Sequence, residues 1–398
     1  MFNVRFVFSL FVVSIAVFFE LNVLLSLVIG YWFCRLIYMV GYVTDIKVNA
    51  GFPWRDEQTI GSYIGYFLIV LALSRRYLFS VFREAIQGAP RHEGDVLSSR
   101  SAVLMFIFCH VGILLWSRLT GASMTSMLLM FAFLVMLGFI SGKIRAECGT
   151  PFGYFTPYNS MLFVTLCGGM AVFGAEGLMV SLILAGFLTV TVFFLIPGMQ
   201  FEMIEVGKRL RLRPRDIVGT CLLGILGGLF IGGWVFLSNA YSIGGDNVRF
   251  QWAFNGLDWF MNSYRSALKE TTATWLRAES GAAVDAPVWG RVMMVYGGVM
   301  AMILAVFRQF FSGFWFHPIG FLLGATPLNA GANWGSLLVA WIIRASVLKV
   351  GGAQAVVRKL QPFFIGVFIG CVVCIAAFTV VNGMAVANGA KNFYQGIP

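Results

Sequence analysis

Charged residues are scarce in this chain. Asp, Glu, Lys and Arg together make up 11% of its 398 residues, whereas they make up about 25% of a typical soluble domain. Hydrophobic residues account for 59%, and the mean hydropathy is +0.84. This balance excludes an ordinary soluble protein. We therefore expect an all-α fold, a polytopic bundle of transmembrane helices surrounded by a lipid bilayer.

Reactive side chains are also few. The chain has three His and seven Cys, and nearly all the Cys lie inside apolar runs. Cys371-Val-Val-Cys374 has metal-like spacing, but it lies in the middle of an apolar run without a second pair of ligands. No Gly-rich phosphate loop and no metal-spaced His/Asp/Glu cluster is present. The sequence predicts no metal, no cofactor and no enzymatic activity.

Apolar segments long enough to cross a bilayer recur along the whole chain, since a span needs about 20 apolar residues. We expect about nine full spans within a single transmembrane domain, residues 1–398. They are 6–28, 59–74, 101–117, 122–141, 159–174, 178–197, 216–238, 291–307 and 362–385. Two shorter pieces, 315–328 and 334–348, would form a pair of half-length, re-entrant helices or two tilted crossings.

Basic residues between the spans orient the bundle, because cytoplasmic loops carry an excess of Lys and Arg. The net charge of +11 is concentrated in such loops and does not indicate nucleic-acid binding. We expect cytoplasmic loops at about 75–100, 198–215 and 349–360. This places the N-terminus of the chain in the cytoplasm and its C-terminus outside. The first apolar run lacks a small-residue cleavage site and is expected to stay as an uncleaved anchor.

Segment 240–290 is the only long hydrophilic stretch. Apolar residues recur in it at helical spacing, with charged residues on other faces. We expect an amphipathic helix that lies on the outer membrane surface or caps the bundle.

The heptapeptide Arg145-Ala-Glu-Cys-Gly-Thr-Pro151 is the first candidate site. It holds Arg145 and Glu147 at the edge of a span, where ionisable groups usually face a bundle interior or a water-filled path. Gly149 and Pro151 would end the helix and free backbone carbonyls, as in the broken helices of transporters. The alternative is a helix end at the lipid headgroups, with Arg145 snorkelling and Glu147 solvated.

His317 starts the first short segment and is a candidate proton-coupling group, because histidine titrates near neutral pH. A lone histidine is also common as a purely structural residue. Glu20 lies inside the first apolar run. Because a charged carboxylate is energetically costly there, we expect an inward-facing partner or a protonated carboxyl.

Gln200 and Glu202 follow a Pro-Gly pair and are further site candidates. The favoured alternative is a solvated interfacial helix, in which Glu202 and Glu205 pair with Lys208 or Arg209 at helical spacing.

Gly224, Gly228 and Gly232 are spaced by four along one predicted span. Rows of small residues let helices approach closely, so these glycines predict helix packing. A second reading is a smooth face that slides during a conformational change.

Several motifs together resemble a group of bacterial polytopic membrane proteins that is distantly related to the oligopeptide transporter superfamily. The C-terminal motifs are Phe314-Trp-Phe-His-Pro-Ile-Gly320, Trp334-Gly-Ser, Ala340-Trp-Ile-Ile-Arg344, Gly351-Gly352 and the run 361–370. Gly51-Phe-Pro, Arg145 to Pro151 and the basic stretch 200–215 are similar as well. The resemblance implies a transporter fold of inverted repeats with a central path and proton coupling, and peptides or peptide-like metal chelates as substrates. Proteins of that superfamily are usually longer, which indicates a shortened version or one subunit.

Two functions follow. In the first, an inner-membrane secondary transporter or transporter subunit moves a small-molecule substrate with protons: Arg145 holds an anionic group, Glu147 exchanges the proton and His317 assists. In the second, the chain is a non-catalytic structural subunit of a larger membrane assembly. The expected partners are the lipid bilayer, the substrate, and a second copy or another membrane subunit, with no nucleic acid.

Overall fold

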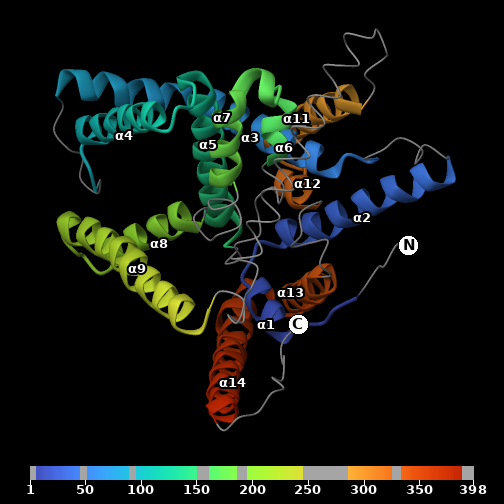
Figure 1. The fold of residues 1–398 in the computed structure, drawn as a ribbon. Helices are drawn as coiled ribbons and strands as arrows, with labels where there is room; N and C mark the ends of the chain where they lie inside the picture. Colours follow the sequence, from blue (N-terminus) through green and yellow to red (C-terminus); the bar gives the residue numbers. More distant parts are fainter. Residues whose placement is uncertain are drawn as a thin grey trace. The chain divides into compact units, whose positions relative to one another are not determined.

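The computed structural model describes residues 6–44, 52–88, 96–149, 161–185, 195–244, 286–324 and 333–387, and within these ranges the chain is helical without a strand (Figure 1). The helices are α1 (Leu10–Ala16), α2 (Leu21–Val43), α3 (Arg55–Gln87), α4 (Ser99–Leu119), α5 (Met124–Cys148), α6 (Met161–Leu166), α7 (Met170–Ala185), α8 (Leu195–Arg209), α9 (Pro214–Ile243), α11 (Ala286–Phe310), α12 (Pro318–Gly324), α13 (Trp334–Ala355), the π-helix η6 (Val356–Leu360) and α14 (Gln361–Ala387). Seven candidate spans in the described ranges are long and apolar enough to cross a membrane. The all-α prediction is confirmed for these residues, and the candidate spans are those of a membrane protein.

The predicted span 6–28 is wrong, because it is not one helix. Helix α1 ends at Ala16, a turn follows, and α2 runs from Leu21 to Val43 as the first helix of spanning length. The predicted span 159–174 is also interrupted: α6 ends at Leu166, and Gly168 and Gly169 adopt positive φ angles of 114° and 53° before α7 begins. Such angles suit glycine and stop a helix. Of the predicted span 178–197, residues 186–194 lie outside the described ranges.

The predicted pair of short helices is half right. Helix α12 has 7 residues, all of them buried. Helix α13 has 22 residues with a kink at Gly352, where φ is 66°, and η6 and α14 follow it, so α13 is not a half-length piece. Residues 325–332, which would join the pair, lie outside the described ranges, as does 245–285 of the predicted amphipathic segment. The orientation of the termini stays a prediction.

The described chain divides into two compact units. Unit 1 contains residues 1–39, 147–152 and 307–398, and unit 2 contains 40–146 and 153–306. Helices α2, α5 and α11 each contribute residues to both units. The prediction of a single transmembrane domain stays a prediction.

In unit 1, α1 packs against α13 and α14. Its N-cap Ser9 accepts the Val12 N–H, and the Ser9 N–H donates to the hydroxyl of Ser336 in α13. Aromatic rings extend this contact, with Phe11 and Phe368 stacked at a centroid distance of 5.5 Å. The short helix α1 is therefore held by tertiary contacts, because a helix of this length is not stable alone.

Helices α2 and α12 of unit 1 touch backbone to backbone. A Cβ atom on Gly30 would overlap the carbonyl oxygen of Gly320, and a Cβ on Gly324 would lie 2.6 Å from the Gly30 carbonyl. Only glycine permits so close an approach. This contact positions His317, which directly precedes α12.

In unit 2, α3 and α11 meet in the same way. Cβ atoms on Gly61 and Gly65 would overlap the carbonyls of Met294 and Gly298. Aromatic side chains add to the packing: Trp54 stacks on Trp289 at 6.1 Å. Helices α8 and α9 form a hairpin through a short turn (Figure 1).

Candidate functional site

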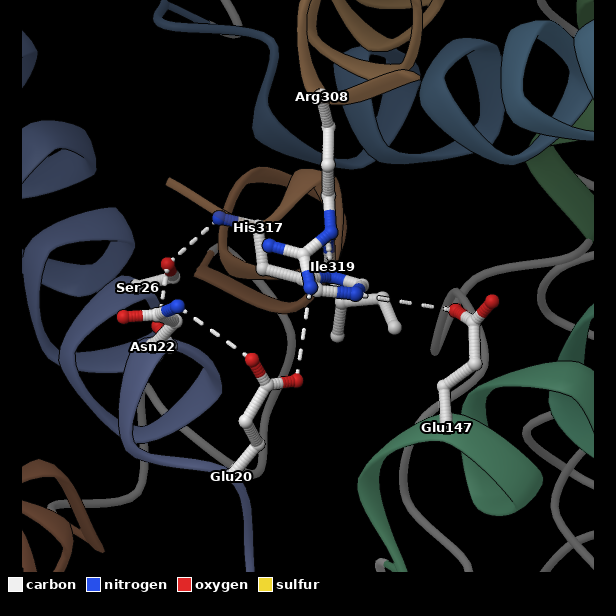
Figure 2. A network of polar contacts seen from close by, with 7 residues as sticks. All are labelled: Glu20, Asn22, Ser26, Glu147, Arg308, His317 and Ile319. Carbon is white, nitrogen blue, oxygen red and sulfur yellow. Dashed lines mark hydrogen bonds and ion pairs between the residues drawn. The ribbon is translucent and has the colours of Figure 1, made fainter. Parts of the chain in front are cut away.

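The break between α1 and α2 holds a carboxylate. Glu20 lies in this break, and its backbone carbonyl accepts the Leu24 N–H in the first turn of α2. Its side chain pairs with Arg308 in the last turn of α11, with Oε2 3.4 Å from Nη2 (Figure 2). Asn22 Nδ2 donates to the other carboxylate oxygen at 3.3 Å. Arg308 is therefore a partner of the kind expected for a carboxylate in an apolar run.

Ser26 links α2 to the segment before α12. Its hydroxyl accepts the backbone N–H of His317 at 2.7 Å and donates to the Asn22 carbonyl at 2.6 Å (Figure 2). Ser26 and His317 are both buried. Because buried polar groups need partners, this hydroxyl satisfies the buried N–H of His317.

The imidazole of His317 has a defined tautomer in this geometry. Its Nδ1 accepts the backbone N–H of Ile319 at 3.2 Å. A backbone N–H can only donate, so Nδ1 carries no proton and the neutral ring carries its proton on Nε2. This Nε2 lies 3.8 Å from Glu147 Oε2 (Figure 2). The N–H therefore faces a carboxylate, and a second proton on the ring would displace the Ile319 N–H.

Glu147 lies at the edge of the buried network. Its side chain is 33% exposed, whereas that of His317 is 6% exposed. Helix α5 ends one residue later at Cys148, and Gly149 adopts a φ of 68°. The predicted helix end is thus confirmed, because this left-handed conformation suits glycine. Pro151 lies outside the described ranges.

Arg145 makes a separate ion pair in unit 2. Its Nε and Nη2 donate to the two carboxylate oxygens of Glu202 at 2.6 and 2.9 Å, in the bidentate geometry that suits a guanidinium. The Arg145 side chain is 12% exposed, and its Nη1 is buried without a hydrogen-bond partner among the described residues. Arg145 and Glu147 are two residues apart on one helix and do not face each other.

A hollow of about 450 Å³ lies beside this ion pair. It is lined by Arg145, Ala146, Gly198, Phe201, Glu202, Glu205, Val206 and Arg209. Gly198 packs on the Arg145 side chain, where a Cβ would lie 3.2 Å from Arg145 Cβ and closer still to Cδ. The hollow presents both guanidinium and carboxylate groups.

The Pro-Gly pair before Gln200 does not break a helix, as a site candidate beside such a pair would require. Pro197 and Gly198 lie inside α8, in its first turn, where a proline is tolerated because its missing N–H has no helical partner. Gln200 follows in the same helix. The predicted pairing of Glu205 with Arg209 is confirmed at 2.9 Å, whereas Glu202 pairs with Arg145.

The glycines of α9 have open space beside them. Within the part of the chain that the structure describes, no atom outside the adjacent residues and the nearby backbone of α9 lies within 4 Å of where a Cβ would stand on Gly224, Gly228 or Gly232. Their role in helix packing stays a prediction.

Sequence reasoning missed Arg308, Asn22 and Ser26. Of the three, only Arg308 could be suspected from the sequence, because it is a lone cation near the end of an apolar run and its charge is opposite to that of Glu20. No group of three metal-binding side chains gathers among the described residues.

A model described as a family of unknown function, DUF6785, matches residues 1–393. No curated protein and no solved structure matches the chain.

Proposed function

The chain belongs to DUF6785, a family of unknown function, and we propose that it is a secondary transporter of the bacterial inner membrane, or a subunit of one, that moves a small solute together with protons. The solute class we propose is a peptide or a peptide-like chelate. The observation that carries the proposal is the contact between the buried His317 and the half-exposed Glu147.

The contact supports proton exchange because its two sides differ in access to water. The Glu147 carboxylate is exposed enough to take up a proton, whereas the imidazole is buried and its Nδ1 is occupied by the Ile319 N–H. Protonation of Glu147 removes the charge that attracts the Nε2–H and so weakens the contact between α5 and the start of α12. The proton would then change the packing of unit 1, which is what coupling requires.

The hollow beside Arg145 supports the choice of solute. A solute carboxylate would compete with Glu202 for the guanidinium of Arg145, which binds carboxylates bidentately. The displaced Glu202 and the nearby Glu205 would then face a cationic group. Neighbouring charges of both signs suit a zwitterionic solute. A peptide is such a solute, because its termini are an ammonium group and a carboxylate.

The test uses the full-length protein reconstituted in liposomes that enclose a pH-sensitive dye. Mixtures of short peptides and peptide-like chelates are added outside, and proton entry is recorded. We expect solute-dependent acidification with the wild-type protein and none with Glu147→Gln. Asp216→Asn, an exposed carboxylate at the start of α9, is the matched control and keeps the signal. Equal acidification by wild type and Glu147→Gln would overturn the role of Glu147.

The second candidate is a structural subunit, favoured by the open glycine face of α9. If lipid covers this face, the face favours neither function. If a helix of another protein covers it, the structural subunit is favoured. Native mass spectrometry of the protein gently extracted from its own membrane distinguishes them. A single species or a homo-oligomer with a bound small molecule supports the transporter, and a defined set of other chains supports the subunit.

A further inference from the structure

The turn after α1 presents backbone carbonyls that the helix does not use. The N–H groups of Phe18 and Phe19 donate back to Ile15 and Ala16, three residues earlier, so the helical pattern tightens and stops. The carbonyls of Val17 and Phe19 lie beyond this end. Both accept hydrogen bonds from one guanidinium nitrogen, Nη1 of Arg344 in α13, and the bond to Val17 measures 2.8 Å.

The Phe19 carbonyl belongs to the peptide group that leads directly into Glu20, so the guanidinium of Arg344 holds the backbone just before that residue. Arg344 thus binds two backbone carbonyl oxygens at a broken helix, and it is itself half-buried. Oxygen ligands of this kind suit hard cations. Unwound carbonyls at helix breaks are also where transporters coordinate monovalent cations.

We propose that Arg344 is a tethered cation that occupies a cation-binding break between α1 and α2 and positions Glu20 for its ion pair with Arg308. The proposed site is a monovalent-cation site of two backbone carbonyls, which the guanidinium of Arg344 occupies in the wild-type chain. The positioning of Glu20 serves transport only if the proposed function holds, whereas the cation site itself is tested without any transport assay.

A small neutral side chain at this position opens the site to a free cation. The experiment compares the thermal unfolding midpoints of purified full-length wild type, R344A and the control R358A, whose arginine is exposed at η6. Each is measured with low millimolar guanidinium, sodium or choline chloride at constant ionic strength. We expect R344A to unfold at a lower temperature than R358A. Guanidinium or sodium should raise the midpoint of R344A by about 2–4 °C in a saturable way, and choline, which is too large, should not.

Equal responses of all three proteins to the salts would overturn the proposal. If R344A yields no folded protein, R344K decides, because it keeps a charge at the break. Recovery of folded R344K supports a cation there, and failure of R344K overturns it. Loss of proton entry in Glu147→Gln is independent of these midpoints, so failure of the proposed function and failure of the cation site are distinguishable.

Discussion

His317 Nε2 lies 3.8 Å from Glu147 Oε2, while the opposite nitrogen of the same ring accepts the backbone N–H of Ile319. One imidazole therefore caps the start of α12 and faces a carboxylate at the end of α5. The two roles use different nitrogens, so substitutions can separate them.

Replacing His317 by Asn should keep the cap and remove the contact with Glu147. The Asn Oδ1 stands close to the position of Nδ1 and can accept the Ile319 N–H, whereas Ala cannot. Loss of such a cap costs about 1 kcal/mol. We expect His317→Asn to be more stable than His317→Ala by about this amount, measured by thermal unfolding, while both lose solute-dependent proton entry. Equal stability of the two variants would contradict the capping role.

Ser26→Ala should destabilise unit 1. The substitution leaves the buried N–H of His317 without its acceptor at 2.7 Å, and an unsatisfied buried donor costs about 1–3 kcal/mol. Ser80→Ala is the matched control, because the Ser80 hydroxyl is exposed and donates within its own helix to the Tyr77 carbonyl. Thermal unfolding midpoints of the two variants measure this difference. Equal shifts of the midpoint would show that the Ser26 hydroxyl does not stabilise unit 1 in this way.

Gly61→Ala and Gly224→Ala should differ sharply in their effect on stability. The added methyl group at Gly61 overlaps the Met294 carbonyl between α3 and α11, and such overpacking costs about 1–3 kcal/mol. At Gly224 the methyl group meets open space among the described residues, and the gain in helix propensity is about 1 kcal/mol. Expression and thermal stability of the two variants in lipid nanodiscs measure the difference. Comparable damage at Gly224 would instead reveal a partner on the α9 face.

The ion pair of Arg145 with Glu202 should couple more strongly than that of Arg209 with Glu205. The Arg145 side chain is 12% exposed, against 77% for Arg209, so solvent screens the first pair less. We expect a double-mutant cycle with Arg145→Gln and Glu202→Gln to give about 1–2 kcal/mol. Exposed pairs one helical turn apart give about 0.3–0.5 kcal/mol. Equal coupling energies would show that the first pair is screened as well.

Local features of the site could be predicted, but its long-range pairs could not. The end of α5 near Gly149 and the Glu205–Arg209 pair depend on residues within one helical turn. Glu20 and Arg308, by contrast, are 288 residues apart. No periodicity specifies which cation meets which carboxylate across such a separation.

The tight glycine contacts show the same limit. The row Gly224, Gly228 and Gly232 has the more regular spacing, yet the described structure places backbone contacts at Gly61 and Gly65 instead. Spacing shows which face of a helix is smooth, and only the packed chain shows what lies against it.

By itself, the sequence determined the helical membrane class, because apolar surface and unsatisfied backbone groups in lipid leave few other solutions. It also determined the end of α5 before Gly149, although it did not reveal the break at Gly168 and Gly169. Tertiary structure alone decided that Arg344 fills the break after α1, that Arg145 meets Glu202 and that His317 faces Glu147. The physical reason is that helix formation depends on neighbouring residues, whereas the choice of a charge partner depends on which helices pack together.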